Sequence, residues 1–124
     1  MNKYPEAAKR VLVVDDDLDT AQSMVRLLRL MGHEVEFAIN GIAALGIAQR
    51  FLPQVVLLDI GLPDSRGWDV ARQLRRIPDL AGARILAITG RTSLDDARRS
   101  LDSGCDEHLR KPLSPDELER LVAR

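Results

Sequence analysis

Carboxylates and a lysine stand directly behind apolar segments of this chain of 124 residues. Asp15 and Asp16 follow one apolar run, Asp59 follows another, and Lys111 stands before Pro112 near the C-terminus. Carboxylate oxygens suit Mg²⁺, and a carboxylate can also act as a nucleophile toward phosphorus. A lysine close by could hold phosphoryl oxygens as a point charge. Together these residue types could perform metal-assisted transfer of a phosphoryl group to an aspartate.

Thr89, which follows a further apolar run, could add a hydroxyl to this group of side chains. Three carboxylates in one pocket repel each other, so at least one would keep its proton unless a cation were bound. A hard divalent cation removes that conflict. We therefore expect Mg²⁺, or Mn²⁺ in its place, as the cofactor.

The apolar runs indicate the strands that must position these residues. Unbroken aliphatic segments at 11–14, 55–58 and 85–88 are typical of strands buried on both faces, as in a parallel sheet. Weaker strand candidates lie at 34–38 and 106–109. In an open α/β sheet, ligands bind at the carboxyl ends of the strands, where the strand order reverses. Asp15, Asp16 and Asp59 are expected to converge there.

Helical patterns alternate with the strands. Asn40, Ser93 and Ser114 are candidate N-caps, and either Asp17 or Asp19 can cap the first helix. The predicted helices cover residues 21–31, 40–51, 68–76, 93–103 and 114–124. Five alternating strand and helix units predict an α/β fold with a doubly wound parallel sheet. We expect residues 1–8 to be a tail and residues 9–124 to be one domain.

Composition excludes several classes of protein. The chain has 18 lysine and arginine residues and 19 aspartate and glutamate residues. It therefore lacks the surplus of basic residues that is typical of a nucleic-acid-binding protein. We expect no membrane span and no signal peptide. The single cysteine, Cys105, excludes an internal disulfide and favours a reducing, cytoplasmic location.

The motifs taken together resemble the receiver domain of bacterial two-component response regulators, over residues 10–123. The matching segments, each behind its own strand, are Val11–Asp16, Val55–Pro63, Gly67, Ala87–Gly90 and Leu109–Pro112. The resemblance implies a flavodoxin-like fold with strand order 2-1-3-4-5. That order comes from the resemblance and not from the spacing.

The resemblance also implies a role for each residue of the site. Asp59 is expected to be the phosphoacceptor and a metal ligand, with Asp16 a direct metal ligand and Asp15 acting largely through water. The backbone carbonyl of Gly61 would be the third protein ligand. Thr89 would bond the phosphoryl group and move toward it after transfer.

Lys111 would neutralise another phosphoryl oxygen, and a cis Lys111–Pro112 bond is expected. The phosphoryl group would come from a phosphohistidine on a sensor histidine kinase or a histidine phosphotransfer protein. The chain would then signal to an unknown downstream protein, through Thr89 and the face of the fourth helix, fifth strand and fifth helix. It would be no enzyme beyond its own phosphotransfer and autodephosphorylation.

Some positions depart from the pattern of the family. His108 stands where many receivers have a rotating Tyr or Phe, so its role is open between a packed histidine and a switch element. The residues around it look more like receivers of hybrid sensor kinases. Gly61 and Arg91 are expected to tune the lifetime of the aspartyl-phosphate, Gly61 by leaving the site open to water and Arg91 by shielding it.

Three other functions fit the sequence less well. A magnesium-dependent phosphatase would need Asp-x-Asp-x-Thr, which the sequence lacks at its strand ends. A flavodoxin-type cofactor module needs a phosphate-binding loop after the first strand, where this chain is acidic. A scaffold that has lost phosphorylation would not need all five site residues.

Single residues also have plainer interpretations. His33 is expected to be exposed in a loop, Cys105 to be a small buried residue, and Arg98 and Arg99 to face solvent. Trp68 is open between a place beside the site and a place on the apolar side of the third helix.

Overall fold

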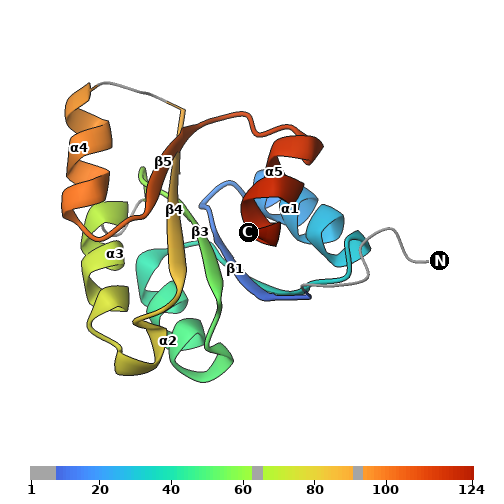
Figure 1. Ribbon diagram of the computed structural model, residues 1–124, viewed down its shortest axis with the longest axis horizontal. Coiled ribbons are helices and arrows are strands. Elements are labelled where there is room, and N and C mark those ends of the chain that lie inside the picture. Colours follow the sequence, from blue (N-terminus) through green and yellow to red (C-terminus); the bar gives the residue numbers. More distant parts are fainter. Residues whose placement is uncertain (1–7, 63–65, 91–93) are drawn as a thin grey trace.

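The computed structural model describes residues 8–62, 66–90 and 94–124, which form one parallel sheet covered by helices (Figure 1). The strands are β1 (Arg10–Val14), β2 (Glu34–Ala38), β3 (Val55–Asp59), β4 (Arg84–Thr89) and β5 (Glu107–Arg110). All pairings are parallel, and the strand order is β2-β1-β3-β4-β5. The α/β class and the order 2-1-3-4-5 are therefore confirmed.

The helices cover both faces of the sheet. They are α1 (Leu18–Leu30), α2 (Gly41–Phe51), α3 (Gly67–Arg75), α4 (Leu94–Asp102) and α5 (Pro115–Ala123), with a short 3₁₀ turn at Pro78–Leu80. Figure 1 shows α1 and α5 on one face and α2, α3 and α4 on the other. None of the described helices is long and apolar enough to cross a membrane.

Side chains alternate between the two faces, as the period of a strand requires. On β1, Leu12 and Val14 pack in the cluster beneath α2 and α3, whereas Val11 and Val13 pack in the cluster beneath α1 and α5. Both sets are almost fully buried. This explains why the runs are apolar without a break: a strand covered on both faces has no polar side.

The caps agree with the sequence where the structure describes them. Asp17 caps α1, Asn40 caps α2, and Ser114 forms a capping box with Glu117 at α5. The predicted cap Ser93 lies outside the described residues. Each cap fixes where a helix begins, just beyond the carboxyl end of a strand.

Most boundaries differ from the expectation by one to three residues, and two of these differences concern the site. Asp59 and Thr89 were expected to follow their strands, but they are the last residues of β3 and β4. The backbone pairing extends one residue past the apolar run, with Asp59 opposite Ile88 and Thr89 opposite Arg110. A strand ends where its hydrogen bonds end, and these two polar residues still take part. Residues 1–7 lie outside the described part, so the division into tail and domain stays a prediction.

Candidate functional site

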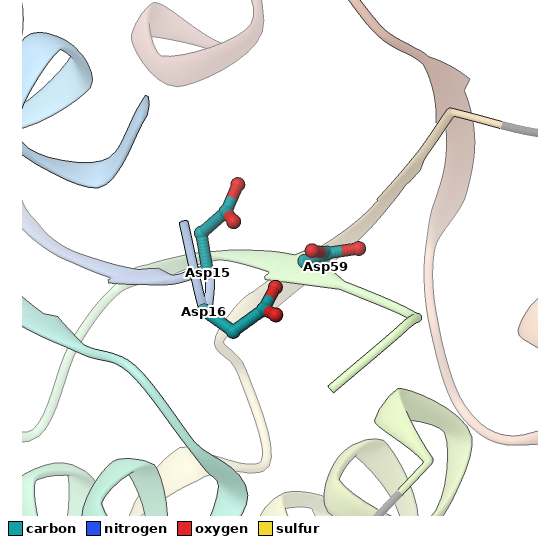
Figure 2. A group of neighbouring side chains, drawn as sticks. All are labelled: Asp15, Asp16 and Asp59. Atoms are coloured by element: carbon teal, nitrogen blue, oxygen red, sulfur yellow. The ribbon is translucent and has the colours of Figure 1, made fainter. Parts of the chain in front are cut away.

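Three carboxylates meet at the carboxyl edge of the sheet. Figure 2 shows the side chains of Asp15 and Asp16, which follow β1, and of Asp59, at the end of β3, gathered around one space. Oxygen atoms of all three lie within 4.8 Å of one another. Asp15 is buried, Asp59 is half-buried and Asp16 is exposed. The convergence follows from the parallel pairing of β1 with β3, which brings both strands to the same edge.

Lys111 reaches this cluster from the segment after β5. Its Nζ donates to Asp15 Oδ2 at 2.8 Å and lies 3.4 Å from Asp59 Oδ2. The Lys111 N–H donates to the Thr89 carbonyl at 2.8 Å, and the Lys111–Pro112 bond is cis, as expected. These contacts place the ammonium group between two carboxylates.

Burial and the neighbouring charges shift the pKa values of Asp59 and Lys111. Burial raises the pKa of Asp59 above its ordinary value, and the Gly61 N–H and the charge of Lys111 oppose that rise only in part. Burial lowers the pKa of Lys111, but its hydrogen bond to Asp15 and the charges of Asp59 and Asp15 outweigh burial, so its pKa is raised. Asp59 therefore holds its negative charge at a cost that a further cation would remove.

The donor set fits a hard divalent cation. Three carboxylates with oxygens this close offer the ligands that Mg²⁺ takes, and a single lysine leaves the cluster with excess negative charge. Gly61 is exposed beside the cluster, and its N–H donates to Asp59 Oδ1 at 3.0 Å. Asp15, Asp16 and Asp59 are thus the side chains that could hold the ion, and a ligand role for the Gly61 carbonyl stays a prediction.

A polar cavity opens from the carboxylates toward α3 and α4. Asp59, Gly61, Thr89 and Lys111 line it. It is lined as well by Arg66, Trp68, Asp96, Arg99 and His108. Among the described residues, the structure therefore brings Thr89 and Lys111 into one cavity with Asp59, beside the cluster of carboxylates.

His108 is packed against α4 and does not point into solvent. Its Nδ1 lies 2.7 Å from the hydroxyl of Ser100, and that hydroxyl also accepts from Trp68 Nε1 at 2.9 Å. Trp68 is buried on α3, with the Arg99 guanidinium 4.0 Å from its ring centre. Trp68 therefore lies both beside the cavity and on the apolar side of its helix. The sequence did not single out Ser100, because a serine within a polar helix carries no signal of burial.

Two of the plainer interpretations are confirmed and one is wrong. Cys105 is buried, and burial raises the pKa of its thiol to about 11. Arg98 and Arg99 are exposed. His33 was expected to be exposed, but it is half-buried and its Nδ1 accepts from the Lys9 N–H at 3.0 Å. The residue preceding β1 folds over the turn before β2, a contact that no local pattern indicates.

Comparison with known proteins places the chain in a family. The model of the response regulator receiver domain matches residues 11–123. A curated relative, response regulator MprA of Mycobacterium sp. (strain KMS), is 40% identical over 115 residues, covering 93% of this chain and 48% of the relative. MprA of Mycobacterium leprae (strain TN) is 39% identical over the same shares. This chain spans about half the length of these relatives. They are described as response regulators, so the likeness to hybrid kinases stays a prediction.

Solved structures agree with this placement. The chemotaxis protein CheY4 of Vibrio cholerae, crystallised at low pH, matches with a TM-score of 0.89 and 29% identity, over 94% of this chain and 97% of that one. A CheY-like receiver domain protein from Methanospirillum hungatei JF-1 matches with a TM-score of 0.86 and 30% identity, over 93% and 90%. This chain belongs to the response regulator receiver domain family of two-component signalling.

Proposed function

We propose that this receiver domain accepts a phosphoryl group on Asp59 in a reaction that requires Mg²⁺ or Mn²⁺. The observation that carries the proposal is the meeting of three carboxylates with Lys111 at one edge of the sheet. A half-buried carboxylate whose pKa is raised by burial, and which shares one lysine with a second carboxylate, is stabilised when a further cation binds.

In the proposed step, an oxygen of Asp59 forms a bond to phosphorus while the bond from phosphorus to a histidine nitrogen of the donor breaks. The electron pair of the broken bond stays on the imidazole of the donor. Lys111 and Thr89 line the cavity beside Asp59, and they would bind two of the phosphoryl oxygens. When bound, the divalent ion neutralises charge on the carboxylates and on the phosphoryl group.

The partners follow from the donor chemistry. We propose a sensor histidine kinase or a histidine phosphotransfer protein as the donor, in the cytoplasm, and a downstream protein that binds one of two conformations of the domain. The signal would leave through Thr89 and the face of α4, β5 and α5. Beyond its own phosphotransfer and autodephosphorylation, the domain would have no turnover.

The test is the intact mass of the protein after incubation with a small acyl phosphate. We expect a gain of one phosphoryl group in the presence of Mg²⁺ and almost none when EDTA is added. Without the ion, the incoming phosphoryl group meets the excess negative charge of the carboxylates.

A control separates failure to react from failure to bind. Beryllofluoride imitates the phosphoryl group and forms its adduct without a transfer step. Adduct formation with beryllofluoride but no mass gain would point to rapid hydrolysis or to a strict need for the kinase. If neither occurred, the proposal would be wrong, and a scaffold without phosphorylation would be the better description.

Gly61 offers a further test, on the lifetime of the aspartyl-phosphate. A Cβ built at Gly61 would lie 3.8 Å from Asp59 Oδ1, an ordinary contact, so a side chain fits here without disturbing the acceptor. We expect Gly61→Leu to slow the decay about fivefold, which corresponds to about 1 kcal/mol in the barrier, because the side chain would restrict the access of water. Decay can be followed by intact mass, with Gly82→Ala, away from the site, as the control. An unchanged rate would contradict the role of Gly61. The companion residue Arg91 lies outside the described residues.

A further inference from the structure

A buried hydroxyl on α4 connects three elements around the site. Ser100 has no exposed surface. Its Oγ lies 2.9 Å from Trp68 Nε1 on α3 and 2.7 Å from His108 Nδ1 on β5. Neither Ser100 nor Trp68 has a part in the phosphoryl chemistry proposed above. The three side chains form a hydrogen-bonded chain that runs from the cavity beside Asp59 into two helices.

The chemistry of the three groups indicates where the hydrogens lie. The indole N–H of Trp68 can only donate, so the hydroxyl of Ser100 accepts from it. The hydrogen of that hydroxyl can then be donated to Nδ1 of His108, which leaves the hydrogen of a neutral ring on Nε2. Nε2 is buried and has no hydrogen-bond partner among the described residues. Among the described residues, the imidazole ring of His108 is therefore hydrogen-bonded through Nδ1 only.

His108 also lies next to Thr89. It is opposite Ala87 on β4, and Thr89 stands two residues further along the same strand, so both side chains face α3 and α4. Ala87 is too small to displace the ring. The charged groups that line the same cavity are Asp59 of β3, Arg66 before α3, Asp96 and Arg99 of α4, and Lys111 after β5. Burial lowers the pKa of His108, and the charge of Asp96 opposes it only in part, which agrees with a neutral ring.

We propose that Ser100 is a positioning residue, which holds His108 inside the cavity as the Nε2–H form, and that the chain of Trp68, Ser100 and His108 transmits occupation of the Asp59 site to α3 and α4. This inference rests on the proposed function in one respect, namely that a phosphoryl group occupies the Asp59 site. A movement of the ring alone would break its hydrogen bond to Ser100 and leave Nδ1 of His108 and the buried hydroxyl hydrogen of Ser100 without partners, which is costly. The ring and the two helices therefore move together.

The first arm of the test uses the protein without metal or phosphoryl mimic. The ¹⁵N signals of His108 in the NMR spectrum report which ring nitrogen carries the hydrogen. We expect the Nε2–H form with a hydrogen-bonded Nδ1, and we expect Ser100→Ala to remove the signature of that bond and to raise the pKa of His108. Ser103→Ala is the matched control, because Ser103 is equally buried but donates to the Arg99 carbonyl of its own helix turn.

The second arm uses Trp68, the single tryptophan of the chain, as a reporter. Beryllofluoride with Mg²⁺ should change the emission of Trp68 over the concentrations at which the site fills, with ¹⁹F NMR as the independent measure of binding. In Ser100→Ala the site should still fill, but most of the emission change should be lost, because the hydrogen bonds that link Trp68 to His108 are absent. Ser103→Ala should respond as the unaltered protein does.

The outcomes separate this inference from the proposed function. An Nδ1–H ring, or His108 signals that Ser100→Ala leaves in place, would overturn the positioning role. A full Trp68 response in Ser100→Ala, or binding of beryllofluoride without any response in the unaltered protein, would overturn the transmission. Absence of beryllofluoride binding would count against the proposed function and the transmission together, while the first arm would still decide the role of Ser100. If Ser100→Ala does not fold, Trp68→Phe, which removes the indole N–H together with the ring that carries it, should shift the same His108 signals.

Discussion

Changing Asp59 to asparagine should abolish incorporation of the phosphoryl group and at the same time make the metal-free protein more stable. The amide oxygen of asparagine is a much poorer nucleophile than a carboxylate, so we expect transfer to fall more than about a hundredfold, the scale of losing an essential catalytic group. Intact mass after incubation with an acyl phosphate and Mg²⁺ measures the first effect. A mass gain in Asp59→Asn that equals that of the unaltered protein would place the acceptor elsewhere.

The gain in stability comes from removing a charge that the fold buries at a cost. Asp59 lies beside the buried Asp15, and Lys111 is 3.4 Å from Asp59 but bonded at 2.8 Å to Asp15. We expect Asp59→Asn to raise the free energy of unfolding in EDTA by on the order of 1 kcal/mol at neutral pH. Urea unfolding measures it, with the exposed Asp69→Asn on α3 as the control. With Mg²⁺ present the sign should reverse, because the variant loses a ligand of the ion.

The pH dependence of this gain follows from the raised pKa of Asp59. Because burial raises the pKa above its ordinary value of 3.8, the folded protein holds the proton more tightly than the unfolded chain. The contribution of Asp59 to the stability of the unaltered protein therefore falls as the pH rises from about that value through the raised pKa, and above that pKa this contribution is constant. The difference between Asp59→Asn and the unaltered protein should be smallest near pH 4 and largest at neutral pH. A difference that does not vary with pH would show that the gain has another origin.

The sequence indicated the site well because the site depends on a simple geometric rule. Asp15, Asp59 and Thr89 each end or follow an apolar run, and parallel strands bring such positions to one edge of a sheet. The order of the strands is a different matter. It depends on which strands pair across the sheet, and the spacing of the runs contains no information about that; the resemblance to a family supplied it.

The contacts that the sequence could not predict are those between helices and the sheet. Ser100 stands in a helix whose other residues are mostly charged, and only the packing of α4 against Trp68 and His108 shows that its hydroxyl is buried. The two interpretations of Trp68 could not be separated for the same reason. The indole ring covers the core with one part and lines the cavity with another. The partial burial of His33 could not be predicted for a different reason. Its hydrogen-bond partner is the backbone N–H of Lys9, and no pattern of side chains in the sequence indicates a backbone partner.

Replacement of Lys111 by methionine should weaken phosphotransfer and strengthen the binding of Mg²⁺, two effects of opposite sign from one side chain. Methionine keeps most of the length of lysine and removes the charge. Loss of a donor that binds a developing negative charge costs on the order of a hundredfold in rate, so transfer at saturating Mg²⁺ should fall by about that factor. Single-turnover incorporation, followed by intact mass, gives the rate.

The gain in Mg²⁺ affinity has an electrostatic cause. In the structure the Lys111 ammonium lies between Asp15 and Asp59, where it occupies a carboxylate oxygen and repels an incoming cation. Its removal should raise the affinity for Mg²⁺ by about tenfold, which corresponds to about 1.4 kcal/mol and is within the range for partly buried charges. Calorimetric titration measures the affinity, and Arg110→Gln, an exposed cation one residue away, is the control. If Lys111 had only a structural role, its removal would weaken both phosphotransfer and Mg²⁺ binding, because a distorted site binds the ion less well. If Lys111 binds the phosphoryl group, its removal slows phosphotransfer but strengthens Mg²⁺ binding.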